Sequence, residues 1–420
     1  MGSQYERLSG PTKGVPAMSE RRPATPAESP EPSRIGVIAL VPDNWHGIWM
    51  PRHHVVGRLA RHFEVVWIEP AKGWRDYWLA NDQEEPAIQS IPAEEYGLTL
   101  YRPGRWLPEL YRPRWLAERI RKQRVINAER MLRKRGCREI VLYLWRPEFD
   151  WAIDAISADL TCYHIDDEYR FSVNDLPNDP REVALIQRAD LVIIHSRKLL
   201  EKKGHLNPQT IHIPNGVDYA AYATPQPEPA DIAGIPHPRL GYVGVIKSQL
   251  DLDLLHRLAQ RRPEWSFIMV GPEGYMGAKK PVLEALKALP NVYFTGNRQL
   301  AELPAYMQAM DVCLMCYEVC DYTHFIYPLK LNEYLATGRP VVCSPIDSVL
   351  PLHEIVGIAG DLDTWDNALQ NALGAERNTA QASAIRQQQA LQHDWNSLVE
   401  EIAAQFRQRI QHGEACHGTD

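Results

Sequence analysis

Residues 328–342 read Pro-Leu-Lys-Leu-Asn-Glu-Tyr-Leu-Ala-Thr-Gly-Arg-Pro-Val-Val. Pro328 suits the first turn of a helix, the residues that follow recur at helical spacing, and Gly338 ends the helix. The N-terminus of a helix presents unpaired N–H groups and a positive dipole end, which together favour a diphosphate. Because Lys330 adds a full positive charge in the first turn, the stretch predicts a nucleotide-diphosphate site.

Glu333 lies three positions after Lys330. A carboxylate at this point of the helix can accept both hydroxyls of a ribose. The alternative is a solvated ion pair between the two side chains, worth about 0.2–0.5 kcal/mol. The surrounding block favours the nucleotide interpretation.

The rest of the chain predicts an α/β protein with two domains. Its 420 residues, 45% hydrophobic and 24% charged with a net charge of -7, provide two hydrophobic cores and the balance of an ordinary globular enzyme. Apolar runs typical of buried parallel strands occupy 35–41, 64–68, 140–144, 160–165, 191–194, 210–213, 240–244, 265–271, 292–296, 311–315 and 340–343. Their spacing leaves room for helices, so we predict two doubly wound, Rossmann-like sheets.

Three strands of the second half end in glycine, at Gly244, Gly271 and Gly296. Glycine lets the backbone approach a ligand at the carboxyl edge of such a sheet. We therefore expect all three glycines to bind the donor nucleotide.

Composition sets the expected boundaries. We expect a disordered tail at 1–33, an N-terminal domain at 34–218 and a proline-rich linker at 219–237. A C-terminal domain at 238–392, a last helix at 393–412 and a second tail at 413–420 follow.

The strand order, the segment Ile213-Pro-Asn-Gly-Val-Asp218 and the block 328–342 resemble GT-B glycosyltransferases. The likeness is to the family 4-like group, glycosyl transferases group 1, and to its bacterial exopolysaccharide and teichuronic-acid type members. It implies two Rossmann-like domains across a cleft, with the acceptor in the first, the nucleotide sugar in the second, and the last helix crossing back. It also implies that Pro328, Leu329, Lys330 and Glu333 bind the donor, with Lys330 facing phosphate and Glu333 facing ribose.

Two positions depart from the family pattern. The group commonly has a carboxylate eight positions before the ribose-binding one, where this chain has Phe325. Glu318, Asp321 and His324 are the alternative sugar-contacting side chains. The family also often places Arg and Lys after the first strand of the second domain, where Lys247 is the candidate here; the alternative is a surface lysine.

An acidic cluster, Asp166-Asp167-Glu168, follows the strand at 160–165 directly. Neighbouring carboxylates raise one another's pKa, which suits a general base. The resemblance to inverting exopolysaccharide glucuronosyltransferases, through a shared Tyr-x-x-x-Asp pattern, makes Asp167 the first candidate and Asp166 the second. The alternative is that one of them caps a helix.

The loop after the first strand carries Trp45, His46 and Gly47. Glycine admits a close ligand and tryptophan stacks on sugar faces, so we expect these residues, with His164, on the acceptor side. The alternative is that the aromatic residues only pack the domain. We predict no metal site here.

Residues 101–124 are basic and rich in Trp, Tyr and Leu. Such a mixture suits an anionic membrane surface, and the alternative is a solvated basic helix. No nucleic-acid-binding motif accompanies it. The seven cysteines are scattered and odd in number, which argues against a disulfide framework. Cys313 and Cys316 point to opposite faces of a predicted strand, which argues against a metal site.

These observations predict a glycosyltransferase that moves a sugar from a UDP- or GDP-sugar to a glycan, lipid-linked or small-molecule acceptor, in surface-polysaccharide synthesis. No cofactor or metal is expected, and no nucleic-acid partner. Without an apolar run of membrane-spanning length or a signal peptide, we expect a cytoplasmic chain, with peripheral contact at the inner membrane face left open. The alternatives are a nucleotide-sugar 2-epimerase and, because of Phe325, an inactive nucleotide-sugar or glycan-binding protein.

Overall fold

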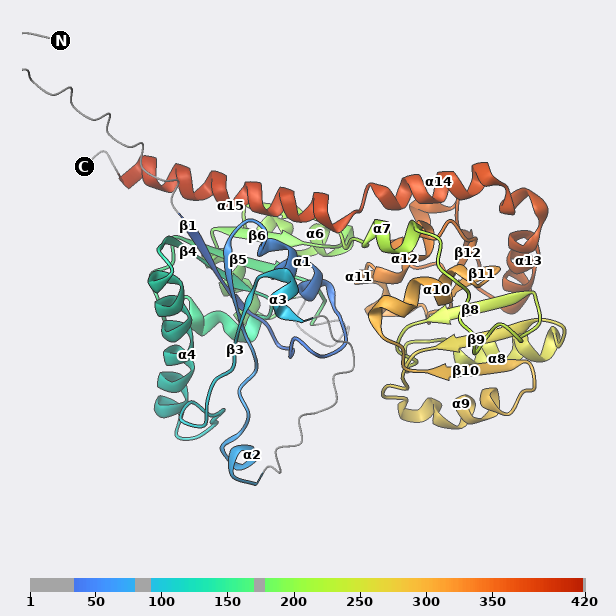
Figure 1. Cartoon of the computed structure of the whole chain (residues 1–420), viewed down its shortest axis with the longest axis horizontal. Coiled ribbons are helices and arrows are strands. Elements are labelled where there is room, and N and C mark those ends of the chain that lie inside the picture. Colours follow the sequence, from blue (N-terminus) through green and yellow to red (C-terminus); the bar gives the residue numbers. More distant parts are fainter. Residues whose placement is uncertain (1–33, 80–91, 170–177, 418–420) are drawn as a thin grey trace, which may run out of the picture. The chain divides into compact units, whose positions relative to one another are not determined.

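The chain folds into two parallel β-sheets, each with flanking helices (Figure 1). The computed structural model describes residues 34–79, 92–169 and 178–417, so the tail predicted at 1–33 lies outside the described residues. Both sheets belong to one compact unit that starts at Arg34.

The first sheet has the strand order β3-β2-β1-β4-β5-β6-β7 within the described residues. Its strands are β1 (Arg34–Leu40), β2 (Glu64–Ile68), β3 (Thr99–Tyr101), β4 (Cys137–Leu144), β5 (Leu160–Ile165), β6 (Leu191–Ile194) and β7 (Thr210–His212). The accompanying helices are α1 (Pro51–Leu59), α2 (Trp74–Leu79), α3 (Ala93–Tyr96), α4 (Arg114–Lys134), α5 (Pro180–Arg188) and α6 (Arg197–Lys203). Helix α7 (Tyr219–Ala223) comes next in the chain but packs against helices of the second sheet.

Alternate residues of β1 supply the two faces of this sheet. Val37 and Ala39 join a core with α1 and α15, whereas Ile38 and Leu40 join a core with α4 and α5. Since side chains of a strand alternate between faces, a strand covered on both sides must be apolar throughout. This requirement explains the continuous apolar run that the sequence shows.

The second sheet has the order β10-β9-β8-β11-β12-β13. Its strands are β8 (Arg239–Val243), β9 (Ser266–Val270), β10 (Val292–Gly296), β11 (Val312–Met315), β12 (Val341–Cys343) and β13 (Gly357–Ile358). Its helices are α8 (Leu252–Arg261), α9 (Lys280–Lys287), α10 (Leu303–Gln308), α11 (Asp321–Phe325), α12 (Leu329–Ala336), α13 (Leu362–Leu373) and α14 (Ala380–Leu391). The prediction of two doubly wound α/β sheets is thus confirmed.

Every apolar run singled out in the sequence forms a strand, but β3 and β13 were not predicted. Both are short edge strands, with only three and two residues. An edge strand of this length lacks the long apolar run on which the prediction depended.

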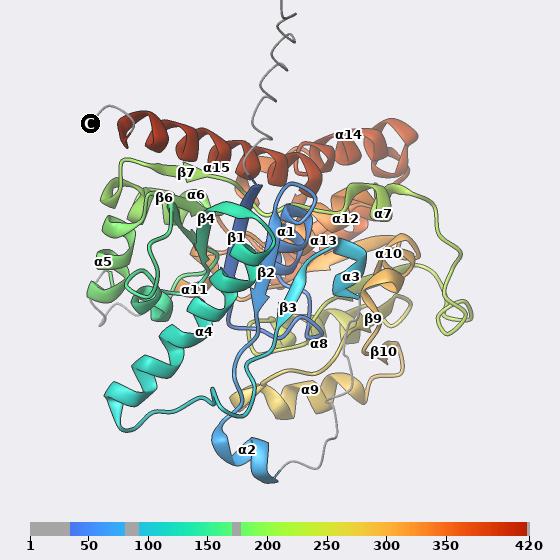
Figure 2. The ribbon, with the colours of Figure 1, turned by 60° about the vertical axis from the view of Figure 1, so that its left-hand side comes forward.

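The last helix, α15 (Trp395–His417), packs against α1 and β5 of the first sheet (Figure 2). It continues beyond residue 412, where the sequence predicted an end. The chain reaches it beside Val217, whose N–H donates to the His393 carbonyl at 2.9 Å while the Trp395 N–H donates to the Val217 carbonyl at 3.0 Å. The expected linker at 219–237 begins with helix α7.

Candidate functional site

A pocket of about 260 Å³ collects the carboxyl ends of strands from both sheets. Asp166 and Asp167 enter it from the end of β5, and Gly244 and Gly271 from the ends of β8 and β9. The start of α12 completes the wall. Doubly wound sheets bind ligands at this edge because the connecting loops diverge there.

Lys330 lies in the first turn of α12, which begins directly after Pro328. Its ammonium donates to the Tyr317 hydroxyl at 2.9 Å and lies 5.3 Å from the centre of the Tyr242 ring. Lys247 lines the same pocket, and burial together with the charge of Lys330 lowers its pKa. Two lysines that repel each other beside a helix N-terminus form a strong site for an anion.

Glu333 is half-buried in the pocket wall, and the Tyr222 hydroxyl donates to its Oε1 at 3.1 Å. Burial raises its pKa, which a solvated surface pair would not do. Glu333 therefore does not form a solvated surface ion pair with Lys330, which was the alternative interpretation.

Gly244 and Gly271 both have positive φ angles, 143° and 138°. A Cβ on Gly271 would lie 2.2 Å from the Gly244 carbonyl oxygen, so only glycine allows the two backbone turns to touch. Both line the pocket. Gly296 does not line it, contrary to the expectation, but its carbonyl accepts from the Gly271 N–H at 2.9 Å and so supports that turn.

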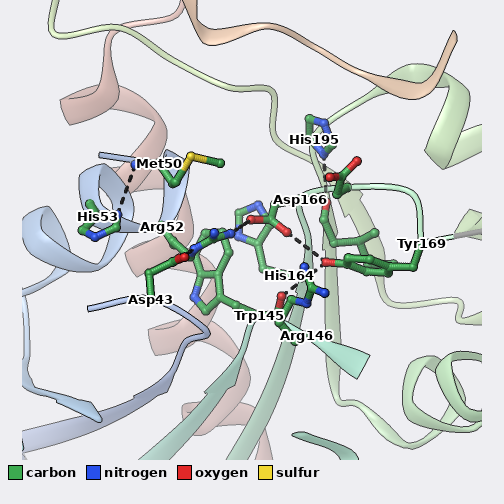
Figure 3. A network of polar contacts seen from close by, with 12 residues as sticks. Asp43, Met50, Arg52, His53, Trp145, Arg146, His164, Asp166, Tyr169 and His195 are labelled. Atoms are coloured by element: carbon green, nitrogen blue, oxygen red, sulfur yellow. Dashed lines mark hydrogen bonds and ion pairs between the residues drawn. The ribbon is translucent and has the colours of Figure 1, made fainter. Parts of the chain in front are cut away.

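Asp166 is fixed by two partners (Figure 3). The Arg52 guanidinium, from α1, forms an ion pair with its Oδ2 and also reaches Asp43, while the Tyr169 hydroxyl donates to its Oδ1 at 3.0 Å. Only 3% of the Asp166 side chain is exposed. A carboxylate engaged on both oxygens in this way is suited to positioning its neighbours.

Asp167 has a different environment, although it is the next residue. Burial and the charge of Asp166 raise its pKa to about 6, outweighing the N–H that Glu168 donates to its Oδ1 at 2.8 Å and the charges of Arg146 and Lys247. A carboxylate with this pKa is mostly ionised at neutral pH, yet it is more basic than an ordinary aspartate and can accept a proton there.

Helix capping does not explain this acidic pair. Residues 166–169 are not helical. The next helix in the described part of the chain, α5, is capped by Asp179, whose side chain accepts from the Arg181 N–H at 2.8 Å.

Two acceptor candidates are corrected by the structure. Trp45 is fully buried, with its ring 5.1 Å from that of Trp67, so it packs the core and does not line the pocket. His164 is also buried, because it stacks on Trp145 at 4.0 Å and its Nδ1 shares a hydrogen bond with the Tyr143 hydroxyl at 2.7 Å. The alternative that aromatic residues pack the domain is correct for Trp45.

His46, Gly47 and His324 also lie outside the pocket lining. The His324 Nδ1 lies 2.7 Å from the Asp347 Oδ2, at hydrogen-bonding distance. The loop that carries His46 and Gly47 does reach the pocket, but through its next residues, Ile48, Trp49 and Met50.

Phe325 occupies the position of the expected carboxylate, and its side chain packs against other residues. Its ring lies 4.9 Å from the Lys202 ammonium and packs against the α4 and α5 core of the first sheet. Tyr322, one helical turn earlier, lines the pocket instead. Burial and the charges of Asp167 and Asp166, which line the same pocket, raise its pKa.

Sequence reasoning missed Tyr322, Tyr317 and His195 as pocket residues. The position of Tyr322 beside the anomalous Phe325 was the only signal for it. His195 is buried, its Nδ1 lies 2.9 Å from the Ile165 carbonyl, and burial lowers its pKa.

Among residues 34–79, 92–169 and 178–417, no group of three or more His, Cys, Asp and Glu side chains is arranged to hold a metal ion. Cys313 and Cys316 are buried with free thiols. No helix within those same ranges is long and apolar enough to cross a bilayer.

Comparison with known proteins agrees with this geometry. Residues 237–374 match the family model of glycosyl transferases group 1. The chain is 31% identical over 232 residues to TuaH of Bacillus subtilis (strain 168), which is named for a glycosyltransferase role in teichuronic acid biosynthesis. That alignment covers 53% of this chain and 57% of TuaH, so the chain spans little more than half the length of this relative.

Two solved structures share the fold over nearly the whole described chain. Anabaena HepE, in complex with UDP, has a TM-score of 0.64 at 16% identity and covers 89% of this chain and 100% of its own. Sucrose-phosphate synthase from Thermosynechococcus elongatus has a TM-score of 0.62 at 16% identity, with 89% and 98% covered. The resemblance to glycosyl transferases group 1 and the GT-B fold are therefore confirmed.

Proposed function

We propose that this chain is a glycosyltransferase that transfers a sugar from a UDP-sugar to an acceptor hydroxyl, in the assembly of a surface polysaccharide. The observation that carries the proposal is the pocket in which Lys330, Glu333 and the glycine turns of the second sheet lie opposite Asp167 of the first. UDP is the nucleotide bound in HepE, and polysaccharide assembly is the role for which TuaH is named.

The second sheet holds the donor in this proposal. The diphosphate lies at the N-terminus of α12 with Lys330 and Lys247, and the backbone of Gly244 and Gly271 approaches it. The ribose hydroxyls donate to Glu333, whose orientation the Tyr222 hydroxyl fixes.

Asp167 acts as the general base. It takes the proton of the acceptor hydroxyl while the acceptor oxygen bonds to the anomeric carbon, and the bond from that carbon to the β-phosphate oxygen breaks. The departing diphosphate gains negative charge, which Lys330 and the helix N-terminus stabilise. Asp166, locked by Arg52 and Tyr169, positions the loop and raises the pKa of Asp167.

Tyr322 replaces the missing carboxylate at the sugar end. Its ring lines the pocket beside the acidic pair, and a phenol can both donate to and accept from a sugar hydroxyl. The same residue supplies an apolar face, so it can hold the transferred sugar without a second negative charge near Asp167.

We also propose that no metal ion is needed for donor binding. The charge of the two lysines and the helix N-terminus neutralises a diphosphate where other enzymes use a cation. UDP-glucose should therefore raise the melting temperature of the protein equally in about 5 mM EDTA and in about 5 mM MnCl₂. The dissociation constant of UDP-glucose sets the size of the rise.

GDP-, ADP- and TDP-glucose in the same thermal-shift experiment test the choice of base. A shift that appears only with manganese would overturn the metal-independent site. A shift with another nucleotide sugar and none with UDP-glucose would overturn the UDP assignment.

Membrane contact through residues 101–124 belongs to the same proposal. Trp106, Tyr111 and Trp115 are 79%, 78% and 67% exposed, and Trp74 in α2 is 52% exposed. Segments 72–77 and 103–109 run side by side, since the Glu109 N–H donates to the Lys72 carbonyl at 2.8 Å. Exposed indole rings on neighbouring segments suit the headgroup layer of a bilayer.

The charge of this surface favours anionic lipid. Arg75, Arg105, Arg112 and Arg114 are exposed around the aromatic rings. The nearby carboxylate of Glu109 is neutralised by ion pairs with Arg121 at 2.6 Å and Arg124 at 2.7 Å. A surface of this kind would hold the protein at the membrane that contains a lipid-linked acceptor.

Replacing both Arg112 and Arg114 by Gln should weaken binding to phosphatidylglycerol vesicles about tenfold or more, since each surface arginine contributes about 1 kcal/mol on an anionic membrane. Vesicle co-sedimentation measures the effect. Removing the exposed rings by Trp106→Ala and Trp115→Ala should also weaken binding, whereas Tyr275→Ala, at an 83% exposed tyrosine of the second sheet's loops, should not. Equal sedimentation of all variants, or none of the wild type, would contradict membrane contact.

A further inference from the structure

A second cavity, of about 320 Å³, lies outside the donor pocket and shares none of its lining residues. It is formed by the turn between α12 and β12, by one side of α14 and by the chain that follows α7. Neither the binding of the donor nor the reaction with the acceptor involves this cavity.

Two arginines give the cavity a positive wall. Arg339 comes from the turn after α12 and Arg386 from α14. The cavity lining, all of it within the described residues, includes no Asp or Glu side chain. The remaining polar groups are neutral and include the Ser383 hydroxyl.

Arg386 is only 2% exposed, and its charge has no carboxylate partner among the described residues. Its Nε donates to the Gly338 carbonyl at 2.9 Å and its Nη2 to the Arg377 carbonyl at 2.8 Å. Burial, and then the charges of Arg377 and Arg339, lower its pKa. A buried cation surrounded by other cations is costly unless an anion approaches it.

Capping of α12 accounts for only part of this arrangement. Arg386 and Gln387 donate to the carbonyls of Gly338 and Ala336, which is a common role for such side chains at a helix C-terminus. Arg339 has no such task, because its guanidinium makes no hydrogen bond or ion pair with any residue that the structure describes. It is half-buried, and it lines the cavity.

We propose that this cavity binds a small phosphorylated molecule of the size of a sugar phosphate, through Arg339, Arg386 and Ser383. The charge of the wall selects an anion, and a guanidinium matches the geometry of a phosphoryl group. The volume of about 320 Å³ is at the small end of ligand pockets and is sufficient for a sugar phosphate. The site is separated from Lys330 by the length of α12, about 12 Å for its eight residues.

Titration of the full chain with glucose 6-phosphate and glucose 1-phosphate, in saturating UDP to fill the donor pocket, tests the proposal. At least one sugar phosphate should bind, and glucose should not. Arg339→Gln should weaken that binding about tenfold or more, as expected for loss of a charge-assisted hydrogen bond, without changing the affinity for UDP.

Arg257→Gln, at an exposed arginine of α8, is the matched control and should bind the sugar phosphate as the wild type does. Equal binding to Arg339→Gln and wild type would overturn the proposal, and so would the absence of binding of either sugar phosphate at millimolar concentration. Because UDP affinity is measured separately, failure of this site is distinguishable from failure of the donor site.

Discussion

Asp167→Asn should lower kcat about 10²- to 10⁴-fold, the usual contribution of a general base, while the affinity for UDP stays within about twofold. The amide keeps the size of the side chain, and its Oδ1 can still accept from the Glu168 N–H, which donates to Asp167 at 2.8 Å in the wild type. Initial rates of UDP release with acceptor, together with calorimetric titration of UDP, measure the two effects. Asp253→Asn, at an exposed aspartate of α8, is the control and should keep full activity.

The pH profile is a second readout of the same prediction. The base must be ionised, and its pKa of about 6 means that it is protonated below that pH. The wild-type kcat/KM for the acceptor should therefore fall about tenfold for each unit below pH 6 and level off above it. An unperturbed aspartate, with a pKa of about 3.9, would keep activity down to about pH 4. A flat profile between pH 5 and 8, or an active Asp167→Asn, would contradict the assignment of Asp167.

Lys330→Met should weaken UDP binding about 10- to 100-fold, since a hydrogen bond to a charged group contributes about 1.5–3 kcal/mol. Methionine keeps an unbranched apolar stem and removes the ammonium that lies over the Tyr242 ring, so the loss reports on charge. Isothermal titration calorimetry with UDP and with uridine separates the phosphate contribution from the base and ribose. Uridine affinity should be unchanged.

Lys280→Ala, at an exposed lysine that begins α9, is the control for this variant and should bind UDP as the wild type does. An equal loss of UDP and uridine affinity in Lys330→Met would mean that the lysine supports the pocket structurally. Unchanged UDP affinity would remove Lys330 from the diphosphate site.

The sheets could be predicted because strands covered on both faces must be apolar along their buried length, as residues 35–40 of β1 and 267–270 of β9 are. The donor half of the pocket could also be predicted, because Lys330 and Glu333 act within one short helix and their spacing is visible in the sequence. The glycine turns were predictable in part: Gly244 and Gly271 face the pocket, but nothing local distinguishes them from Gly296.

The acceptor half depends on contacts between distant segments. The ion pair of Arg52 with Asp166 joins residues 114 positions apart, so the sequence does not show which of the two adjacent aspartates is held by an arginine. Loop tryptophans were also ambiguous. Trp45 is fully buried and Trp106 is 79% exposed, and only the fold determines which face each one meets.

Phe325 shows the limit of transferring a motif by position. The carboxylate expected there is absent because the side chain packs against the first sheet, and Tyr322 occupies the pocket in its place. The five-residue helix α11 carries both residues, and only their contacts in the fold show which of them lines the pocket.

A crystal structure of the chain with UDP tests the central claim most directly. We expect the diphosphate oxygens within hydrogen-bonding distance of Lys330 and of the first N–H groups of α12, and both ribose hydroxyls on the Glu333 carboxylate. UDP bound with its ribose on Asp166 or Asp167, or bound away from α12, would contradict the account.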